Sequence, residues 1–384
     1  MLIMVDILMA IPPPVNPNNP IQKMLVGEGA FYKQANYEQV TKQELTSSKA
    51  LPPVYKHTIE SKVWRVVKDI FSVIFFPLGI YRLIHMAVGK AIIVPAATPQ
   101  KLGYRPDYAI HQRSNIVVDQ QDEWKMKRLS IKVDGYIIDA AIIGRESTFG
   151  NGRWVLESNG NGEFYEDKLN NHSFKQILSK LEGNAIVFNY PGVGSSSGMP
   201  DRKAMEKAYR AMLTFLEDKE KGIGAKEIIG HGHSIGGGVQ GEALQHHKMK
   251  DGTKYVYVKS RTFSNLSKVP NHKVLSFATK LFGWDISSVE SSKKLKAPEI
   301  IIQTAYVSAP TDLAESSAIP AAKNQAHKIR DDGIISPDAS LAKKLLDDNA
   351  TENKYFMGVR EGHNEELANP DELVDKIKEM LKNQ

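Results

Sequence analysis

The stretch Gly-His-Ser-Ile-Gly at residues 232–236 decides the fold of this chain, because it stands between an apolar run at 227–229 and a predicted helix that begins at Gly237. Its glycines lie two positions before and two positions after the serine, where a sharp turn from strand to helix leaves room only for small residues. Such a turn raises the serine hydroxyl above the strand end, near a helix N-terminus whose partial positive charge stabilises developing anions. The motif predicts a nucleophilic serine, Ser234.

Strand and helix patterns surround this turn. Runs rich in β-branched residues at 127–133, 136–143 and 153–157 are separated by Asp-Gly and Gly-Asn-Gly turn signals, which predicts opening antiparallel strands. Beyond them, we predict helices at 173–181 and 203–218, and strands at 185–188, 227–229, 255–258 and 299–303. Strands separated by helices form parallel sheets that are covered on both faces. We therefore expect an α/β protein with a mostly parallel central sheet.

Two further segments resemble a known family. Leu-Glu-Ser-Asn-Gly-Asn-Gly-Glu at 156–163 is similar to the end of the oxyanion strand in the α/β-hydrolase superfamily, with Asn159 where that family often has histidine. Phe-Asn-Tyr-Pro-Gly-Val-Gly-Ser-Ser-Ser-Gly at 188–198 resembles the family's Tyr-Arg-Gly-x-Gly-x-Ser loop, with Pro191 in place of arginine. Residues 128–379 thus resemble the serine esterase, lipase and thioesterase branch. The resemblance implies the α/β-hydrolase fold, with helices on both faces of the sheet; the residue pattern before it adds a helical N-terminal extension.

A serine hydroxyl needs a base within hydrogen-bond reach, and usually an acid that orients the base. The resemblance implies the order Ser, Asp, His along the chain. The histidines that follow the serine turn are His246, His247, His272, His327 and His363. We choose His363 as the base, because it lies in a short loop between a strand-like run at 355–357 and the last predicted helix, where the family places its base.

The candidate acid is Asp332, in the sequence Asp-Gly-Ile-Ile-Ser at 332–336, which resembles the family's acid loop. Asp312 is closer in sequence to the preceding strand and Asp331 is adjacent, so both remain alternatives. Residues 305–330 then form an insertion near the mouth of the site, which is either a lid, a substrate contact or a structural insertion.

An oxyanion hole needs two donors that are fixed before the reaction, and backbone N–H groups serve this purpose. The resemblance assigns them to Ile235, directly after the serine, and to Asn161. The alternative for residues 159–162 is a plain turn, since Asn-Gly pairs mark turns in many settings.

The chemistry that the resemblance implies is cleavage of a carboxylic ester or thioester, in a lipid or an acylated protein, through an acyl-enzyme. We expect neither a metal nor an organic cofactor. His231 and His233 have a two-residue spacing, but no cysteine or clustered carboxylate completes a metal site around them. The competing hypothesis is a non-catalytic interaction protein on a degenerate hydrolase scaffold, because a fold does not fix a function.

The composition is that of a folded soluble protein. The chain has 384 residues, of which 41% are hydrophobic and 24% charged, and this excludes collagen-like and wholly disordered classes. It contains no cysteine, which rules out disulfides and thiolate zinc sites. The net charge of +6 is too small for a nucleic-acid-binding signature, so we expect no nucleic-acid partner.

Three regions are expected along the chain. Residues 1–53 are predicted to be largely irregular and outside the main core, because five prolines fall between positions 12 and 20. Residues 54–105 form a helical, apolar and basic extension, and residues 106–384 the catalytic domain. The apolar start at 1–10 has no basic segment and is a poor secretory signal.

The extension contains an apolar basic segment at 62–90. Apolar residues from Val63 to Ile74 recur at helical spacing, and five basic residues accompany one acidic residue. The run that is apolar all round, 70–80, spans about 17 Å as a helix, against a hydrocarbon core of about 30 Å, so a simple transmembrane span is not expected. The segment is either an interfacial membrane anchor or a helical pair packed on the catalytic domain. We accordingly expect a cytoplasmic or peripherally membrane-associated protein.

The whole chain also resembles, more weakly, SidB-type hydrolase-like effectors secreted by intracellular bacteria. This resemblance implies a translocated bacterial effector. An acidic cluster near the C-terminus is compatible with an export signal and is equally explained by helix capping; its members are Glu365, Glu366, Asp371 and Glu372.

Overall fold

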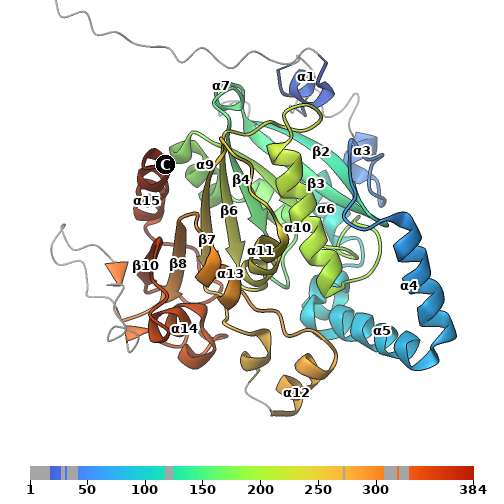
Figure 1. Cartoon of the computed structure of the whole chain (residues 1–384). Helices are drawn as coiled ribbons and strands as arrows, with labels where there is room; N and C mark the ends of the chain where they lie inside the picture. Colours follow the sequence, from blue (N-terminus) through green and yellow to red (C-terminus); the bar gives the residue numbers. More distant parts are fainter. Residues whose placement is uncertain are drawn as a thin grey trace, which may run out of the picture.

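A ten-stranded sheet runs through the centre of the described residues, in the order β1-β2-β3-β5-β4-β6-β7-β8-β10-β9 (Figure 1). The computed structural model describes residues 18–26, 31–32, 42–116, 124–270, 273–306, 318–319 and 328–384. The strands are β1 (Tyr55–His57), β2 (Trp124–Val133), β3 (Tyr136–Arg145), β4 (Arg153–Ser158), β5 (Asn184–Phe188), β6 (Glu227–His233), β7 (Lys254–Ser260), β8 (Glu299–Thr304), β9 (Ala318–Ile319) and β10 (Lys354–Val359).

The sheet is mostly parallel, as predicted. Antiparallel pairing occurs between β2 and β3, between β3 and β5, and at the β9–β10 edge. The successive pairs from β5 through β4, β6, β7 and β8 to β10 are parallel, and β1 pairs parallel with β2. The carboxyl ends of the parallel strands therefore meet at one edge, where loops collect candidate functional side chains.

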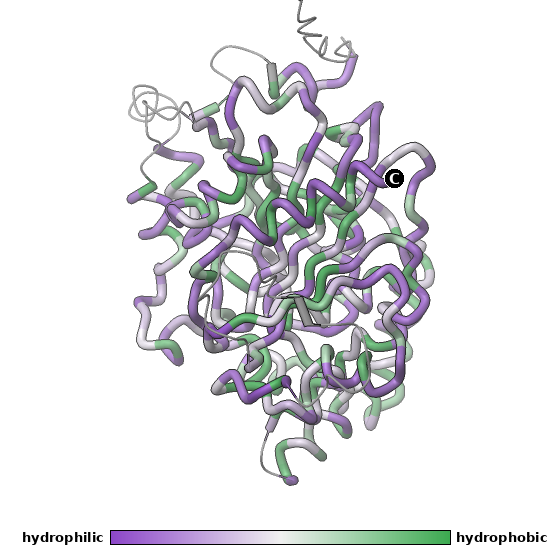
Figure 2. Tube along the Cα trace, turned by 90° about the vertical axis from the view of Figure 1, so that its left-hand side faces the viewer, coloured by the Kyte–Doolittle hydropathy of each residue, from purple (hydrophilic) through white to green (hydrophobic). Residues whose placement is uncertain are grey.

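Helices cover both faces of this sheet. Side chains of α10 (Arg202–Glu217) and α11 (Ile235–His246) pack on one face, and those of α9 (His172–Leu181) and α15 (Pro370–Lys382) on the other. Successive strand residues point to opposite faces, so Leu156 belongs to the first core cluster and Val155 to the second. In Figure 2 hydrophobic segments run through the middle of the molecule. This architecture, with the serine turn after the central strand β6, confirms the predicted α/β-hydrolase fold.

The remaining helices lie around this core. Those of the catalytic region are α7 (Glu146–Phe149), α8 (Tyr165–Asn170), η5 (Leu266–Lys268), α12 (Lys273–Leu281), α13 (Val289–Lys294), η7 (Pro337–Ala339) and α14 (Leu341–Asp347). Those of the extension and its continuation are α4 (Lys62–Ile74), α5 (Phe76–Val88), the π-helical turn η2 (Gly89–Ile93), η3 (Pro95–Ala97), η4 (Pro99–Leu102) and α6 (Tyr108–Ser114). The α4–α5 hairpin extends away from the body (Figure 1).

The prediction that residues 1–53 lie outside the main core is wrong for part of this region. Two short helices, α1 (Pro20–Val26) and α3 (Lys42–Thr46), occur there, and Ile21, Leu25 and Phe31 are buried in the main core cluster. The buried Asn19 side chain accepts a 2.9 Å hydrogen bond from the amide of Ile21 and donates one of 2.9 Å to the carbonyl of Gly222. This cap starts a helix directly after the prolines and fixes it to the catalytic domain.

Candidate active site

Ser234 occupies the strained turn between β6 and α11. Its backbone has φ 54° and ψ −121°, a conformation that few non-glycine residues adopt and that often occurs at functional positions. A Cβ on Gly236 would lie 2.1 Å from the carbonyl oxygen of Ser158, and one on Gly232 would lie 2.7 Å from the amide nitrogen of Gly237. Both positions thus require glycine for the reason that the sequence suggested: the turn brings the neighbouring backbone into contact.

His363 reaches the serine from the loop between β10 and α15. Its Nε2 lies 2.9 Å from the Ser234 Oγ, and the residue is only 6% exposed. Its Nδ1 lies 2.9 Å from the Oδ2 of Asp332. Because an ionised carboxylate can only accept hydrogen bonds, Nδ1 carries the proton and Nε2 is left to accept the proton of the serine hydroxyl.

Asp332 is buried and held in an ionised state by hydrogen bonds. Burial would raise its pKa, but hydrogen bonds from His363 and from the backbone N–H groups of Ile335 and Ile334 more than offset this effect, so the pKa is lowered. The two amides donate to Oδ1 at 2.7 and 2.9 Å, which leaves Oδ2 for the imidazole. The carboxylate is therefore fixed in position before any substrate arrives.

The structure also places one of the alternative acids. Asp331 is exposed, and its Oδ1 accepts a 2.7 Å hydrogen bond from the amide of Gly333, so it caps the turn instead of facing His363. Asp312 lies outside the described residues, as does most of the insertion at 305–330. The two ends of that insertion lie side by side, because the amide of Tyr306 donates a 2.8 Å hydrogen bond to the carbonyl of Lys328.

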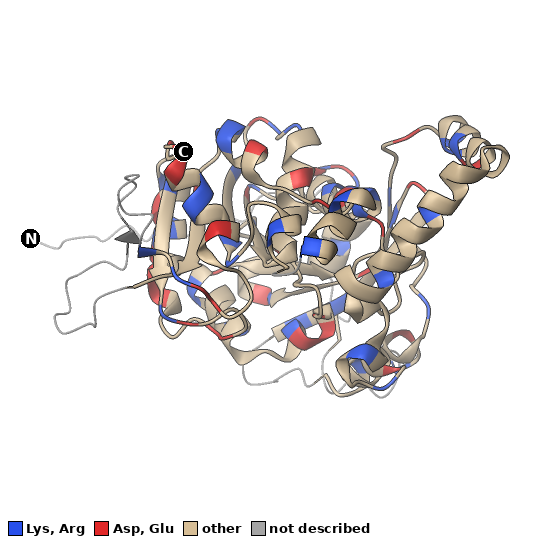
Figure 3. Cartoon of the chain, turned by 90° about the horizontal axis from the view of Figure 1, so that it is seen from below, with Lys and Arg blue, Asp and Glu red and all other residues tan. Residues whose placement is uncertain are grey.

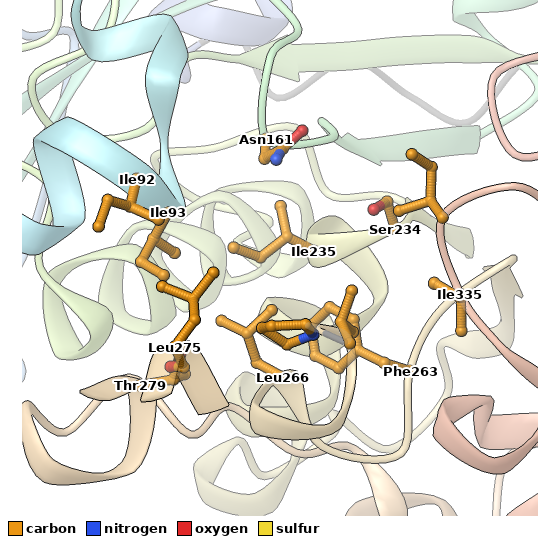
Figure 4. A pocket seen from close by; sticks show the side chains of 13 residues that line it. Ile92, Ile93, Asn161, Ser234, Ile235, Phe263, Leu266, Leu275, Thr279 and Ile335 are labelled. Atoms are coloured by element: carbon orange, nitrogen blue, oxygen red, sulfur yellow. The ribbon is translucent and has the colours of Figure 1, made fainter. Parts of the chain in front are cut away.

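Asn161 and Ile235, the predicted oxyanion donors, border the same pocket as Ser234 (Figure 4). Ile235 is the first residue of α11, so its amide has no partner within the helix. No hydrogen bond among the described residues uses the backbone N–H of Ile235 or Asn161. The amide of Gly160, by contrast, donates to the carboxylate of Glu163 at 2.6 Å. The backbone N–H groups of Asn161 and Ile235 thus remain available to bind an oxyanion, whereas the N–H of Gly160 is already used in a hydrogen bond.

The pocket beside Ser234 is small and mostly apolar. It has a volume of about 130 Å³, and Figure 4 shows Ile92, Ile93 and Leu275 on the side away from Ser234. The other lining residues are Asn161, Ile235, Phe263, Leu266, Val269, Pro270, Thr279, Ile334 and Ile335. An apolar pocket next to a nucleophile suits an acyl group, and its walls come from η2, α12 and the loop that carries Asp332.

Arg261 is a site residue that the sequence reasoning missed. It is 5% exposed, lies directly after β7 and has φ 45°. Its Nη1 donates 2.6 Å hydrogen bonds to the carbonyl oxygens of Gly362 and Glu365, on either side of His363. Arg261 belongs to no sequence motif. The sequence feature that could have indicated its role is its position, three residues after the predicted strand at 255–258.

His231 and His233, the two histidines shortly before the serine, contact different partners. His231 Nδ1 pairs with the Glu157 carboxylate at 2.7 Å, while the ring of His233 lies 4.9 Å from that of His363. In the part of the chain that the structure describes, no group of three or more His, Cys, Asp or Glu residues could hold a metal ion. Burial and the nearby Arg261 lower the pKa of His233 well below its usual value.

A family model described as Chlamydia CHLPS protein (DUF818) matches residues 37–383, which is most of the chain. The chain belongs to the CHLPS (DUF818) family. The matched range contains Ser234, Asp332 and His363 together with the α4–α5 hairpin.

Curated relatives of this CHLPS family member are much longer proteins. Over 104 residues it is 31% identical to the multifunctional-autoprocessing repeats-in-toxin proteins of Vibrio cholerae and Vibrio vulnificus. That match covers 26% of the chain and 2% of each toxin.

Solved structures similar to this CHLPS family member include hydrolases. An alpha-beta hydrolase from Vibrio vulnificus has 16% identity and a TM-score of 0.49, with 87% of this chain and 98% of that one covered. An esterase from Pyrococcus furiosus has 16% identity and a TM-score of 0.46, with 69% and 94% covered.

Proposed function

We propose that this protein is a serine hydrolase that cleaves a carboxylic ester or thioester through an acyl-enzyme intermediate. The observation that carries the proposal is the continuous hydrogen-bonded chain from the Ser234 Oγ through the His363 imidazole to the Asp332 carboxylate, with 2.9 Å at each step. These are the three parts that activate a serine: a nucleophile, a base within reach of its proton, and an acid that fixes the orientation of the base.

In this mechanism, the Ser234 Oγ attacks the substrate carbonyl carbon as its proton passes to His363 Nε2. The amides of Asn161 and Ile235 donate hydrogen bonds to the oxygen that becomes negatively charged. The tetrahedral intermediate then collapses: the carbon bond to the leaving group breaks, and His363 returns the proton to the departing alcohol or thiol. Asp332 stabilises the imidazolium in both steps and keeps its own negative charge.

Water completes the cycle. It attacks the acyl carbon while His363 Nε2 takes one of its protons, and the Ser234 Oγ leaves with that proton as the free acid is released. The apolar lining of the pocket favours a hydrocarbon acyl chain, which is consistent with a lipid or an acylated protein as substrate.

Labelling with a fluorophosphonate probe tests the proposal. We expect the wild-type protein to be labelled and Ser234→Ala not to be labelled, whereas a variant at Ser173, a half-buried serine on α9, Ser173→Ala, keeps the wild-type label. A panel of aryl esters and acyl thioesters of increasing chain length then ranks the substrates. Equal labelling of wild type and Ser234→Ala, or none in either, would overturn the proposal and favour a non-catalytic interaction protein on this scaffold.

A further inference from the structure

The α4–α5 hairpin exposes an unusual amount of apolar surface. Of the 24 large hydrophobic side chains that are exposed among the described residues, 15 lie between positions 63 and 84. Three of the most exposed lie around the turn between the two helices: Val73 is 80% exposed, Ile74 76% and Phe76 72%. No side chain of α4 belongs to any of the core clusters. A contiguous apolar surface of this kind marks an interaction site.

Polar contacts join the two helices. The Ser72 hydroxyl accepts a 2.8 Å hydrogen bond from Arg82, which also pairs with Asp69 at 3.0 Å. Gly79 allows a close approach at the same place, since a Cβ there would lie 2.6 Å from the carbonyl oxygen of Ser72. Ser72 is buried, whereas Ile70, two residues before it and thus on nearly the opposite side of the helix, is 53% exposed. The arrangement, with polar groups between the helices and apolar groups outside, is the reverse of what water favours.

The hairpin is fixed to the catalytic domain at its base. The ring of His85 stacks on that of Trp284 at 4.5 Å, and the indole N–H donates a 2.8 Å hydrogen bond to the carbonyl of His85. Gly89 packs so closely on the same indole that a Cβ would lie 2.3 Å from it. The hairpin therefore has a defined orientation relative to the pocket at Ser234.

The same anchoring limits how the hairpin can meet a bilayer. Phe76–Ile93 is long and apolar enough, by length and composition, to cross a membrane. However, its residues from His85 onward are held by the body, and the whole of α5, at 13 residues, is about 20 Å long, against about 30 Å of hydrocarbon. The free end can therefore enter the interfacial region but cannot cross the bilayer.

The charges of the hairpin match an anionic surface. Lys62, Arg65 and Lys68 lie on the first half of α4 and Lys90 follows α5, whereas residues 70–81, around the turn between the helices, carry no charge and are bounded by the Asp69–Arg82 pair. Figure 3 shows blue segments among tan ribbon on the helices that extend from the body. Basic residues near the base and bare hydrocarbon at the end are the distribution of an interfacial anchor on anionic lipid. This charge pattern favours a lipid surface over a neutral protein groove.

Helix α12 continues the apolar surface around the pocket. It exposes Val274 to 81%, Phe277 to 65% and Leu281 to 51%, and its C-terminal end touches the hairpin, because the Phe282 carbonyl lies 2.6 Å from the His85 Nδ1. In Figure 1 α5 and α12 both lie below the sheet. The pocket lies between them: Leu275 of α12 and the residues of η2 that follow α5 line it.

We propose that the α4–α5 hairpin, together with the exposed face of α12, docks into the surface of a bilayer that contains anionic lipids. Docking places the mouth of the apolar pocket against the membrane, from which an acyl chain can pass between η2 and α12 to Ser234. The proposal of docking is argued from the surface of the hairpin and does not depend on the proposed function, whereas the delivery of acyl chains to Ser234 rests on that function.

Flotation with lipid vesicles tests the docking. We expect the full chain to float with vesicles of phosphatidylcholine containing about 30% phosphatidylglycerol, and less with pure phosphatidylcholine. The double variant Val73→Ser/Phe76→Ser removes two large apolar groups and lowers binding at least about tenfold. Val54→Ser is the matched control, because Val54 is 44% exposed but lies outside the hairpin, and it keeps wild-type binding. Lys62→Glu/Lys90→Glu reduces the preference for phosphatidylglycerol and its sensitivity to salt.

Tryptophan fluorescence gives a second readout. Trp64, on α4, is 55% exposed, whereas Trp124, Trp154 and Trp284 are at most 3% exposed, so a change in emission on adding vesicles reports Trp64. We expect a blue shift, and quenching by lipids brominated near the headgroup that exceeds quenching by lipids brominated at the chain end.

Three outcomes would overturn the docking. In the first, the wild-type chain fails to float with either vesicle. In the second, the wild-type chain is a dimer by light scattering and Val73→Ser/Phe76→Ser is a monomer, which assigns the surface to a second copy. In the third, Trp64 is quenched most by lipids brominated at the chain end, which indicates insertion through the membrane. Fluorophosphonate labelling in the absence of vesicles tests the proposed hydrolase function independently of membrane docking. If every variant floats as expected and none is labelled, the docking holds and the hydrolase proposal fails.

Discussion

The backbone amide of His363 donates a 2.7 Å hydrogen bond to the carbonyl oxygen of Asp332. The two residues are thus joined twice, once through the backbone and once through the pair formed by Nδ1 and Oδ2. The backbone hydrogen bond fixes the relative position of the two loops, so the side chains of Asp332 and His363 are already placed to pair. A change of the Asp332 side chain therefore tests its charge and leaves the loop contact in place.

Asp332→Asn should lower kcat about 10³- to 10⁴-fold without unfolding the protein. An asparagine amide can donate to Nδ1, which moves the imidazole proton to Nε2 and blocks acceptance of the proton from Ser234. Steady-state hydrolysis of an aryl ester measures the effect, and the thermal midpoint serves as the control for folding. Nearly unchanged kcat would show that Asp332 does not orient the base.

Arg261→Met should lower kcat about 100-fold with little change in KM. The variant loses both donors to the carbonyls of Gly362 and Glu365, so the loop that carries His363 is displaced, and a misplacement of about 1 Å at a base costs this much. The rate of fluorophosphonate labelling should fall in parallel, and Arg261→Lys should recover part of it. A variant that loses only thermal stability, with kcat unchanged, would assign Arg261 a structural role.

Gly236→Ala should destabilise the protein by about 1–3 kcal/mol and abolish labelling of Ser234. The added Cβ would meet the backbone oxygens of Ser158 and Asn159 at 2.1 and 2.8 Å, and backbone cannot move aside cheaply. Gly183→Ala is the control, because its Cβ finds no atom closer than 3.6 Å. Urea unfolding compares the two, and equal midpoints would contradict the close contact seen at the turn.

Arg113→Met should cost about 3–5 kcal/mol of unfolding free energy. The guanidinium is fully buried, pairs with Glu166 and Asp139, and donates a 2.7 Å hydrogen bond to the carbonyl of Leu45. Without it Glu166 loses its buried cation, and Asp139 keeps only its 2.8 Å pair with Arg128. Burial already raises the pKa of Glu166 to about 7, and loss of the arginine raises that pKa further. Arg105→Met removes only an exposed pair, and no measurable change is expected. Comparable losses of unfolding free energy in both variants would refute the conclusion that the buried contacts of Arg113 stabilise the fold.

His233 should make the protein less stable as the pH falls below about 6.5. Burial, followed by the charges of Arg261 and His363, lowers the pKa of His233 in the folded state, so the unfolded chain binds the proton more strongly. Protonation of the unfolded chain then costs the folded state about 1.4 kcal/mol between pH 7.5 and 5.5. His233→Gln should lack this loss, as urea titrations at both pH values can show. Identical pH dependence in both proteins would mean that His233 has the same pKa in the folded and unfolded states.

Much of the fold followed from local patterns. The runs at 127–133 and 136–143 correspond to β2 and β3, and the turn between them has Asp134 at φ 49°. Asn369, a residue type that favours the N-cap position, precedes α15, and its side chain accepts a 3.2 Å hydrogen bond from the amide of Asp371. Such features depend on contacts within a few residues, so the sequence alone is sufficient to locate them.

Other features depended on distant contacts. Short helix α1 forms because Asn19 bonds to a loop about 200 residues away, and no local pattern can reveal that partner. Arg261 acquires its role only because β7 ends beside the loop of His363. The three residues Ser234, Asp332 and His363 could each be named from the sequence, but their convergence requires β6, β8 and β10 to run parallel, with their carboxyl ends at one edge of the sheet.

By itself, the sequence determined the order of strands and helices, the glycine-bounded serine turn and the identity of the residues now joined by hydrogen bonds. It left open whether the apolar stripe of 62–90 packs on the domain or faces outward, because an amphipathic helix specifies that one face must be covered and not what covers it. The tertiary structure decided this: Trp284 holds the hairpin at His85 and leaves its free end uncovered. The physical reason is that burial depends on surfaces brought together from opposite ends of the chain, which no local spacing encodes.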